Sequence, residues 1–207
     1  MARLQMGVFA SGRGSNFLSI LNAIDERRLD ADIRILISNN PEAGALNSAR
    51  GRNIPAGVIN RADFPDRETF VREMFSVLRN HGADFIALAG YMKKIPDEVI
   101  HAFAGRIINI HPALLPAFGG KGMYGRFVHE AVVRAGCKVS GATVHLVDDQ
   151  YDHGPIVAQR AIPIPDTDTP EDVAARVLRV EHQIYPETLQ LFAEDKVRVR
   201  NGRTYIR

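Results

Sequence analysis

The sequence has little cysteine and no excess of charge of either sign. Cys137 is the single cysteine among 207 residues, so no internal disulfide can form, and this usage agrees with a reducing compartment. We expect a packing role for Cys137, because no histidine or basic residue stands beside it in a recognisable motif and free cysteines are usually buried. The net charge of +2 is too balanced to indicate nucleic-acid binding by itself.

Long apolar runs are also missing. Nothing approaches the roughly 18 consecutive apolar residues of a membrane-spanning helix, so we expect no membrane partner. The N-terminal segment Met1–Met6 lacks the apolar stretch and the small-residue cleavage site of a signal peptide. Hydrophobic residues make up 45% and charged residues 24%, the balance of a soluble globular protein. We therefore expect a cytoplasmic protein, folded as a single domain over residues 1–207, that is a monomer or a homodimer.

The first half of the chain alternates strand-like and helix-like segments. Short apolar runs bounded by turn residues are typical of buried parallel strands, and they occupy Leu4–Ala10, Ile33–Ser38, Ala56–Ile59, Phe85–Ala89 and Ile107–Ile110. The segments between them have helical patterns and are Asn16–Arg27, Gly44–Asn53, Arg67–Asn80 and Asp97–Ala104. This repeat predicts an α/β fold with an open, mostly parallel twisted sheet and helices on both faces.

The second half has a different pattern. Val139–Val147 and Ile156–Ile164 are strand-like runs joined by the turn Asp148–Pro155, and they predict an antiparallel or mixed extension of the sheet. A long helix is expected over about Thr169–Ala193. The basic tail Lys196–Arg207 alternates on both sides of an Asn-Gly pair, which predicts a β-hairpin with its charges facing solvent.

A glycine-rich loop follows the first expected strand and opens a helix. Open parallel sheets bind ligands outside the carboxyl ends of their strands, and glycines at a helix N-terminus let an anion approach the backbone amides. The loop residues are Gly12, Arg13, Gly14, Ser15 and Asn16. No Gly-Lys-Ser/Thr ends the loop, and the third glycine of a dinucleotide fingerprint is missing. The loop therefore predicts a site for a single phosphate group; the alternative is a tight turn with a serine or asparagine helix cap.

Two polar side chains appear in the apolar run before Pro112. A spacing of two puts Asn109 and His111 on the same side of a strand, and Pro112 restricts His111 to extended geometry. A reaction that develops an oxyanion and moves protons needs hydrogen-bond donors for the oxyanion and a titratable group for the protons. We expect Asn109 to be a neutral donor and His111 a protonated one. A structural histidine with satisfied hydrogen bonds is the alternative.

A carboxylate close to His111 would favour the charged imidazolium and raise its pKa. The acidic turn that follows the strand-like run Val139–Val147 supplies Asp148, Asp149 and Asp152. Sequence spacing alone does not choose among these three.

These features, with several others, resemble the glycinamide ribonucleotide formyltransferase family, folate-dependent enzymes of purine biosynthesis. The matching segments follow the family's order over nearly the whole chain and are Ser11–Asn16, Leu88–Met92, Ile108–Pro116, Gly141–His145, Asp152–Pro155 and Glu181–Pro186. The Asn-x-His-Pro-x-Leu-Leu-Pro motif is shared by formyl-folate enzymes as a group. The glycine loop and the Glu-His segment resemble the glycinamide ribonucleotide formyltransferases in particular. A Rossmann-like formyltransferase fold is implied.

The resemblance also implies roles for individual residues. Asn109 and His111 would polarise the formyl group of 10-formyltetrahydrofolate, with Asp152 supporting the charge on His111. The phosphate of glycinamide ribonucleotide would lie at Gly12–Asn16, and Glu181 would stand near the substrate's reactive amine. The implied folate contacts are Arg67, Met92, Lys93, Lys94, Ile95 and Asn109. His145 matches an active-site position beside the catalytic pair, and no metal is implied.

Each of the less specific positions also has a structural interpretation. Glu181 could be exposed and merely solvated, Met92 and Ile95 could be core residues, and His145 could be a hydrogen-bonded strand histidine. The segment Phe118–Arg126 is rich in glycine and is expected to form a mobile flap over the site.

Other functions are less consistent with the sequence. Methionyl-tRNA formyltransferase shares the catalytic motif but has an additional C-terminal domain, for which we expect no room after Arg207. Formyltetrahydrofolate hydrolase has an N-terminal regulatory domain, which a strand starting at Leu4 disfavours. A zinc hydrolase could use His111, His145 and Asp152, yet no close-spaced motif such as His-Glu-x-x-His is present. A non-catalytic phosphate-binding module would not need Asn109 with His111.

Overall fold

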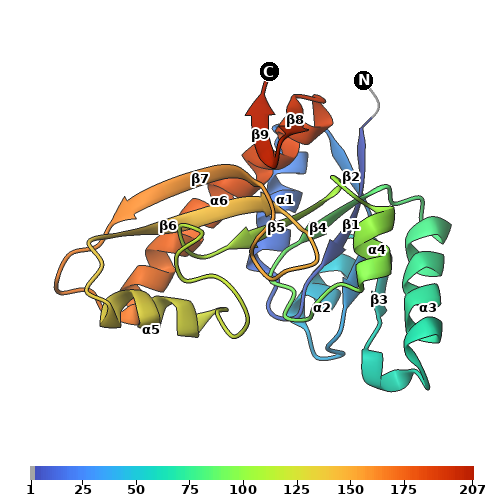
Figure 1. The fold of residues 1–207 in the computed structure, drawn as a ribbon. Helices are drawn as coiled ribbons and strands as arrows, with labels where there is room; N and C mark the ends of the chain where they lie inside the picture. Colours follow the sequence, from blue (N-terminus) through green and yellow to red (C-terminus); the bar gives the residue numbers. More distant parts are fainter. Residues whose placement is uncertain (1–2) are drawn as a thin grey trace. The chain divides into compact units, whose positions relative to one another are not determined.

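The computed structural model describes residues 3–207, and the first two residues of the expected leaderless segment Met1–Met6 lie outside the described part. Seven strands form a mixed sheet in the order β3-β2-β1-β4-β5-β6-β7, and β8 and β9 form a separate ribbon (Figure 1). The chain divides into two compact units, an N-terminal unit of residues 1–108 and a C-terminal unit of residues 109–207. The expectation of one domain over residues 1–207 stays a prediction.

The N-terminal unit is built on parallel strands. They are β1 (Leu4–Phe9), β2 (Ala31–Ser38), β3 (Ala56–Val58) and β4 (Phe85–Leu88), and the pairs β1–β2, β1–β4 and β2–β3 are all parallel. Buried residues such as Val8, Phe9 and Leu36 lie on these strands, which explains their near-continuous apolar sequences.

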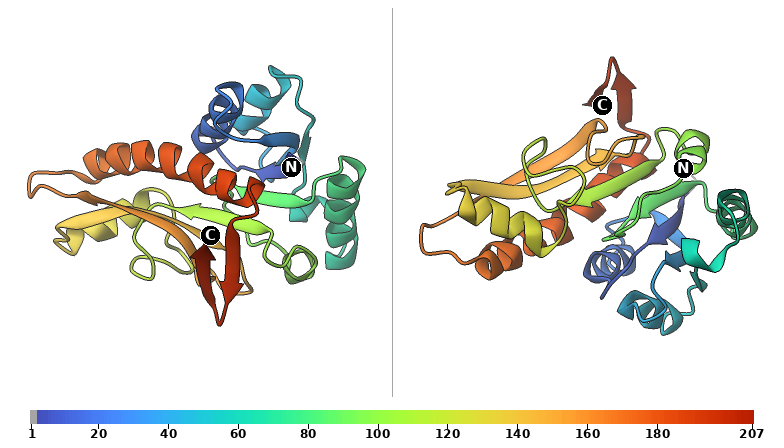
Figure 2. Two further views of the ribbon diagram at one scale, coloured as in Figure 1. Left: turned by 90° about the horizontal axis from the view of Figure 1, so that it is seen from above. Right: turned by 60° about the horizontal axis from the view of Figure 1, so that its bottom comes forward.

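Four helices and one 3₁₀ turn connect these strands. They are α1 (Ser15–Asp25), α2 (Gly44–Arg50), η1 (Arg61–Asp63), α3 (Arg67–Asn80) and α4 (Asp97–Ala102). Because crossovers between parallel strands are right-handed, α1 and α2 lie on one face of the strands β3-β2-β1-β4, and α3 lies on the other face with α4 beside it (Figures 1 and 2). The predicted helices on both faces are therefore present.

The C-terminal unit contains the mixed part of the sheet. The strand β5 (Ile107–His111) runs into this unit, and β6 (Val139–Leu146) pairs antiparallel with β7 (Ile156–Pro163). The helix α5 (Arg126–Arg134) lies between β5 and β6 in the chain. The predicted antiparallel extension in the C-terminal half is confirmed.

The long helix α6 (Pro170–Ala193) packs against β6, β7 and α5. Its start is well specified, because the side chain of Thr169 accepts from the Asp172 N–H, that of Asp172 accepts from the Thr169 N–H, and Pro170 occupies the first turn. Val177, Tyr185 and Leu189 are fully buried on this helix. After it, β8 (Val197–Arg200) and β9 (Arg203–Ile206) form the hairpin that the tail predicts.

Three details differ from the expectations. Several predicted ends extend one to three residues beyond the observed ones, as where α4 ends at Ala102 instead of Ala104. The helix α5 was not predicted, because Gly125 at its N-cap provides no side-chain cap. Cys137 is only half-buried, so it does not have the fully packed position that we expected. No helix within residues 3–207 has the length and apolar character needed to cross a bilayer.

Candidate active site

The C-terminal unit brings four predicted polar side chains into one cluster. Asn109 and His111 lie at the end of β5, His145 lies on β6, and Asp152 comes from the turn between β6 and β7. Only 3% of the His111 side chain, 3% of the His145 side chain and 13% of the Asp152 side chain are exposed. Burial on this scale strengthens the electrostatic interactions among these three side chains.

His111 has a protein partner near each ring nitrogen. Its Nε2 lies 2.8 Å from the carbonyl oxygen of Phe118, and because a carbonyl only accepts, Nε2 carries a hydrogen. Its Nδ1 lies 3.5 Å from Asp152 Oδ2, which is an ion-pair distance rather than a good hydrogen bond. The Phe118 carbonyl therefore occupies the one N–H of the neutral imidazole that the resemblance expects to polarise the formyl group.

His145 orients the amide of Asn109. The His145 Nδ1 donates to the carbonyl of Leu146 at 2.8 Å, so its Nε2 presents a lone pair. The Asn109 Nδ2 lies 3.1 Å from this Nε2 and donates to it. One amide hydrogen of Asn109 is thereby used by His145, and the second stays available for a ligand oxygen. The distance of 3.6 Å from His145 Nε2 to Asp152 Oδ1 is too long for a direct hydrogen bond.

Among the acids of the turn, Asp152 lies beside His111. The competing Asp148 is occupied elsewhere, because it lies 2.7 Å from His153 Nδ1 and accepts from the Gln150 N–H at 2.9 Å. Asp152 also accepts from the Gly120 N–H at 2.9 Å. Burial alone would raise the pKa of Asp152, but the imidazoles of His145 and His111 and the Gly120 N–H together lower it. Asp152 is therefore an anion at neutral pH.

The expected influence of a carboxylate on His111 is present, but it does not decide the net direction in which the pKa of His111 shifts. Burial lowers its pKa below 6.5, and this effect exceeds the raising influence of Asp152 and of the Phe118 carbonyl. His145 lowers the pKa further. In this structure His111 is thus neutral at pH 7, and it must gain a proton to act as a protonated donor.

Thr143 holds the turn that follows His111. Its buried hydroxyl donates to the Ala113 carbonyl at 2.6 Å and accepts from the Leu115 N–H at 3.0 Å. Gln159 Nε2 donates to the same hydroxyl at 3.0 Å and to the Leu115 carbonyl at 2.9 Å. These bonds join the turn to β6 and β7 and fix the direction in which the chain leaves Asn109 and His111.

The glycine-rich loop lies in the N-terminal unit. Gly14 has φ +82° and a Cβ placed on it would lie 2.7 Å from the Cβ of Ala45, so both its conformation and its packing require glycine. Gly12 and Arg13 are exposed, Ser15 is half-buried and Asn16 is buried. No side chain caps the first turn of α1, and the alternative of a serine or asparagine cap is therefore wrong.

A hydrogen-bond network fixes the entrance of this loop. The Ser11 hydroxyl donates to Asn39 Oδ1 at 2.5 Å and accepts from the Met92 N–H at 2.8 Å. Asn40 Nδ2 donates to the Ser11 carbonyl at 3.2 Å. The loop thus joins the ends of three parallel strands, which is where open sheets bind ligands.

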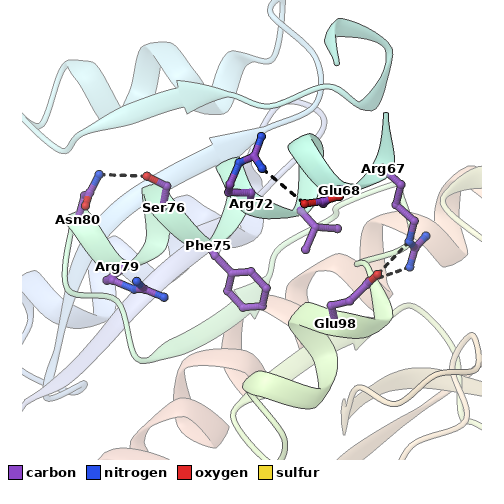
Figure 3. A pocket seen from close by; sticks show the side chains of 9 residues that line it. Arg67, Glu68, Arg72, Phe75, Ser76, Arg79, Asn80 and Glu98 are labelled. Atoms are coloured by element: carbon purple, nitrogen blue, oxygen red, sulfur yellow. Dashed lines mark hydrogen bonds and ion pairs between the residues drawn. The ribbon is translucent and has the colours of Figure 1, made fainter. Parts of the chain in front are cut away.

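The residues of the N-terminal unit that are expected to contact the formyl donor differ in how exposed their side chains are. Met92 is 49% exposed, so the alternative core position is wrong for it, whereas Ile95 is 2% exposed and is a core residue. Lys93, Lys94 and Arg67 are exposed. Arg67 is bound by Glu98 across the groove between α3 and α4 (Figure 3).

Glu181 is not a solvated surface residue. It is 7% exposed on α6, and the pKa of Tyr185, one turn later, is raised by burial and by the charge of Glu181. The alternative of an exposed Glu181 is therefore wrong. A buried glutamate is the type of group that takes up a proton or holds an amine.

Sequence reasoning missed the main-chain partners of the cluster. The Phe118 carbonyl and the Gly120 N–H contact His111 and Asp152, and both belong to the predicted flap. Main-chain groups carry no sequence signal, but the positive φ of Phe118 and Gly120 marks an unusual turn here. The flap is therefore attached at its start to the two catalytic candidates. Within the described chain, no group of three or more metal-ligating side chains has the arrangement of a metal site.

Comparison with known proteins gives one consistent family. A family model described as "Formyl transferase" matches residues 4–189. The chloroplastic phosphoribosylglycinamide formyltransferase of Vigna unguiculata is 45% identical over 94% of this chain and 62% of that protein. The phosphoribosylglycinamide formyltransferase of Bacillus subtilis is 40% identical over 90% of this chain and 93% of that protein. The crystal structure of glycinamide ribonucleotide transformylase 1 from Symbiobacterium toebii has a TM-score of 0.92 at 37% identity, over 99% of this chain and 94% of that one. The chain thus spans less than two thirds of the plant relative and nearly all of the bacterial ones.

Proposed function

This chain belongs to the formyl transferase family, and we propose that it transfers the formyl group of 10-formyltetrahydrofolate to the amine of glycinamide ribonucleotide in purine biosynthesis. The observation that carries the proposal is the convergence of Asn109, His111 and Asp152 in one buried cluster. An amide donor, an imidazole and a carboxylate are the groups that acyl transfer to an amine requires.

In the proposed reaction, the amine nitrogen of the substrate forms a bond to the formyl carbon. The carbonyl electrons move onto oxygen, and the free N–H of Asn109 and the Nε2–H of His111 stabilise this oxyanion. Such preorganised donors are most effective in a buried site, where they need no reorganisation. The bond between the formyl carbon and the donor nitrogen then breaks, and its electron pair returns to that nitrogen.

Proton balance requires a titratable group. The amine loses one proton and the departing nitrogen gains one, so no net proton is consumed. His111 is neutral when buried without a ligand, and the developing negative charge on oxygen favours its protonated form. Asp152, an anion beside Nδ1, stabilises the imidazolium and leaves Nε2–H directed at the oxyanion.

For His111 to reach the formyl oxygen, its Nε2 must leave the Phe118 carbonyl. Displacement of the segment Phe118–Arg126 is therefore part of the proposed cycle. The same displacement would release the Gly120 N–H from Asp152. Binding of the donor is thus coupled to movement of the flap.

The substrate phosphate is proposed to bind at Gly12–Asn16, where the backbone N–H groups at the start of α1 have no side-chain cap. Glu181 is proposed to hold the substrate amine, since a buried carboxylate prefers a positively charged or donor partner. Arg67, Lys93 and Lys94 are proposed to bind the carboxylates of the donor, with Met92 packing on its apolar part.

The test is a stoichiometric assay of the purified protein. The chain is mixed with 10-formyltetrahydrofolate and glycinamide ribonucleotide in the presence of a metal chelator, and formylated product, tetrahydrofolate and formate are measured together. We expect one formylated product for each tetrahydrofolate, at a rate that the chelator does not change. Formate release without formylated product would identify a hydrolase, and loss of activity with chelator would indicate a metal-dependent reaction.

A further inference from the structure

Two carboxylates in the first turn of α4 bind Arg67 and Lys94, which are basic side chains expected to bind the formyl donor. Glu98 accepts from Arg67 Nε at 3.1 Å and from Arg67 Nη2 at 2.8 Å. Asp97, the preceding residue, accepts from Lys94 Nζ at 2.7 Å. Each of these two adjacent carboxylates on one short helix therefore binds a different basic side chain.

The Arg67–Glu98 contact uses one edge of the guanidinium. Because the bonds come from Nε and Nη2, the other edge, with Nη1 and the second hydrogen of Nη2, points away from Glu98 and can accommodate a second carboxylate. Asp97 Oδ2 is 3.9 Å from Nη2, which is beyond hydrogen-bond distance. Glu98 therefore fixes Arg67 without using all of its donors.

This pair closes one end of a groove of about 700 Å³ between α3 and α4. Val71 and Phe75 supply its apolar lining, and Figure 3 shows Glu98 across the groove from Arg67. The side chains of Arg67 and Glu98 are 57% and 49% exposed, so solvent and a ligand can reach the free edge of the guanidinium.

We infer that Glu98 is a positioning residue that holds Arg67 in the orientation that binds a carboxylate of the formyl donor. The inference rests on the proposed function and deepens it. A long arginine side chain loses rotamer freedom when it binds a ligand, and a side chain that is already held loses less. Asp97 holds Lys94 by a single hydrogen bond, without the bidentate geometry of the Arg67–Glu98 pair.

Stability alone does not account for the pair. Exposed ion pairs contribute little to folding, and two acids placed beside two ligand-binding cations reduce the positive potential that attracts an anion. The benefit lies in the bidentate geometry, which fixes the plane of the guanidinium. Glu98 thus acts through Arg67 and touches no reacting atom.

The test compares two donors in the wild-type chain and in Glu98→Gln. One donor carries its glutamate, and in the other a neutral amide replaces that glutamate. We expect Glu98→Gln to raise KM for the glutamate donor roughly 2- to 5-fold, the range of an exposed ion pair, with kcat unchanged. KM for the amide donor should not change. Glu26→Gln, which removes the carboxylate 2.7 Å from Arg28 Nε at an exposed pair outside the groove, is the matched control and should change neither KM.

A second measurement separates positioning from folding. In the background of Arg67→Gln, Glu98→Gln should have no further effect on KM, because its action passes through Arg67. An equal rise in KM for both donors, or an additive effect in the double variant, would overturn the inference and leave the proposed function intact. A fall in KM for the glutamate donor would show that Glu98 competes with the ligand for Arg67. Absence of transfer by the wild-type chain would overturn the proposed function, and the inference with it.

Discussion

At the scale of single residues, burial and charge have opposing effects on His111. Desolvation lowers its pKa, while Asp152 at 3.5 Å from Nδ1 raises it, and desolvation is the larger effect. The ring is therefore neutral until a negative charge develops near Nε2. This makes Asp152 the residue that decides how easily His111 becomes an imidazolium.

Asp152→Asn tests this relation. Loss of the carboxylate removes the largest influence that raises the pKa of His111 and leaves the burial that lowers it. Activity that depends on protonated His111 falls as pH rises through this pKa. In Asp152→Asn this falling limb of the pH profile should therefore move to lower pH, and turnover at neutral pH should decrease. The measurement is kcat against pH, with Asp148→Asn as control because Asp148 pairs with His153. A shifted limb in Asp148→Asn and none in Asp152→Asn would contradict the assignment.

At the scale of structural elements, the turn after β5 depends on a side chain of another strand. Thr143 on β6 satisfies the Ala113 carbonyl and the Leu115 N–H, both in the segment that follows His111. Buried main-chain groups left unpaired are costly. The position of His111 is therefore coupled to β6.

Thr143→Val should lower the free energy of unfolding by about 1–3 kcal/mol, because the isosteric valine leaves these buried groups without partners. Urea unfolding measures the change. Thr188→Val is the matched control, since Thr188 is equally buried but makes one local bond, to the Ile184 carbonyl at 2.7 Å. The account is contradicted if both valine variants lose the same free energy.

The loop between β1 and α1 gives a second prediction at this scale. Ser15 is half-buried in the first turn of α1, where its hydroxyl can donate to a phosphate oxygen. Ser15→Ala should raise KM for the phosphorylated substrate about 2- to 10-fold, the effect of one hydrogen bond, and leave KM for the donor unchanged. Initial-rate kinetics with each substrate varied in turn provides the measurement. A change confined to the donor would reverse the assignment of the loop.

The predictability of each element depended on whether its signals were local. The helix α3 was predicted with both ends correct, since Asp66 caps it by accepting from the Thr69 N–H. The hairpin β8–β9 was predicted from its Asn-Gly turn and alternation. The helix α5 was missed, because a glycine-rich segment precedes it and no capping side chain marks its start.

The candidate site shows the same division. The two-residue spacing of Asn109 and His111 placed them together, but the choice among three aspartates depended on how a distant turn folds back. The Phe118 and Gly120 contacts are made by main-chain atoms, which every residue has. The pKa of His111 depended on its final burial, which spacing does not specify.

At the scale of the whole molecule, buried histidines make stability depend on pH. Burial lowers the pKa values of His111, His129 and His182 below the 6.5 of an exposed histidine. At these histidines the unfolded chain therefore binds more protons than the folded chain once pH falls through 6.5, so their contribution lowers stability in that direction and is constant above it. The carboxylates with lowered pKa values, such as Asp152, act only at more acidic pH.

We accordingly expect the denaturant midpoint to be lower at pH 5.5 than at pH 7.5. His129→Gln should reduce this difference, because it removes one of the three groups. Ser140→Ala, a change at a buried residue without a titratable group, is the control and should leave the difference unchanged. A midpoint that is equal at both pH values, or higher at pH 5.5, would contradict the role of burial.

The most direct test of the catalytic cluster is the turnover of His111→Ala. The account predicts that formyl transfer to glycinamide ribonucleotide falls by roughly 10²–10³ in kcat, the effect of losing one oxyanion donor, while the chain stays folded. His153 lies in the turn between β6 and β7 but outside the cluster, so His153→Ala should keep full activity. Wild-type turnover in His111→Ala would contradict the account.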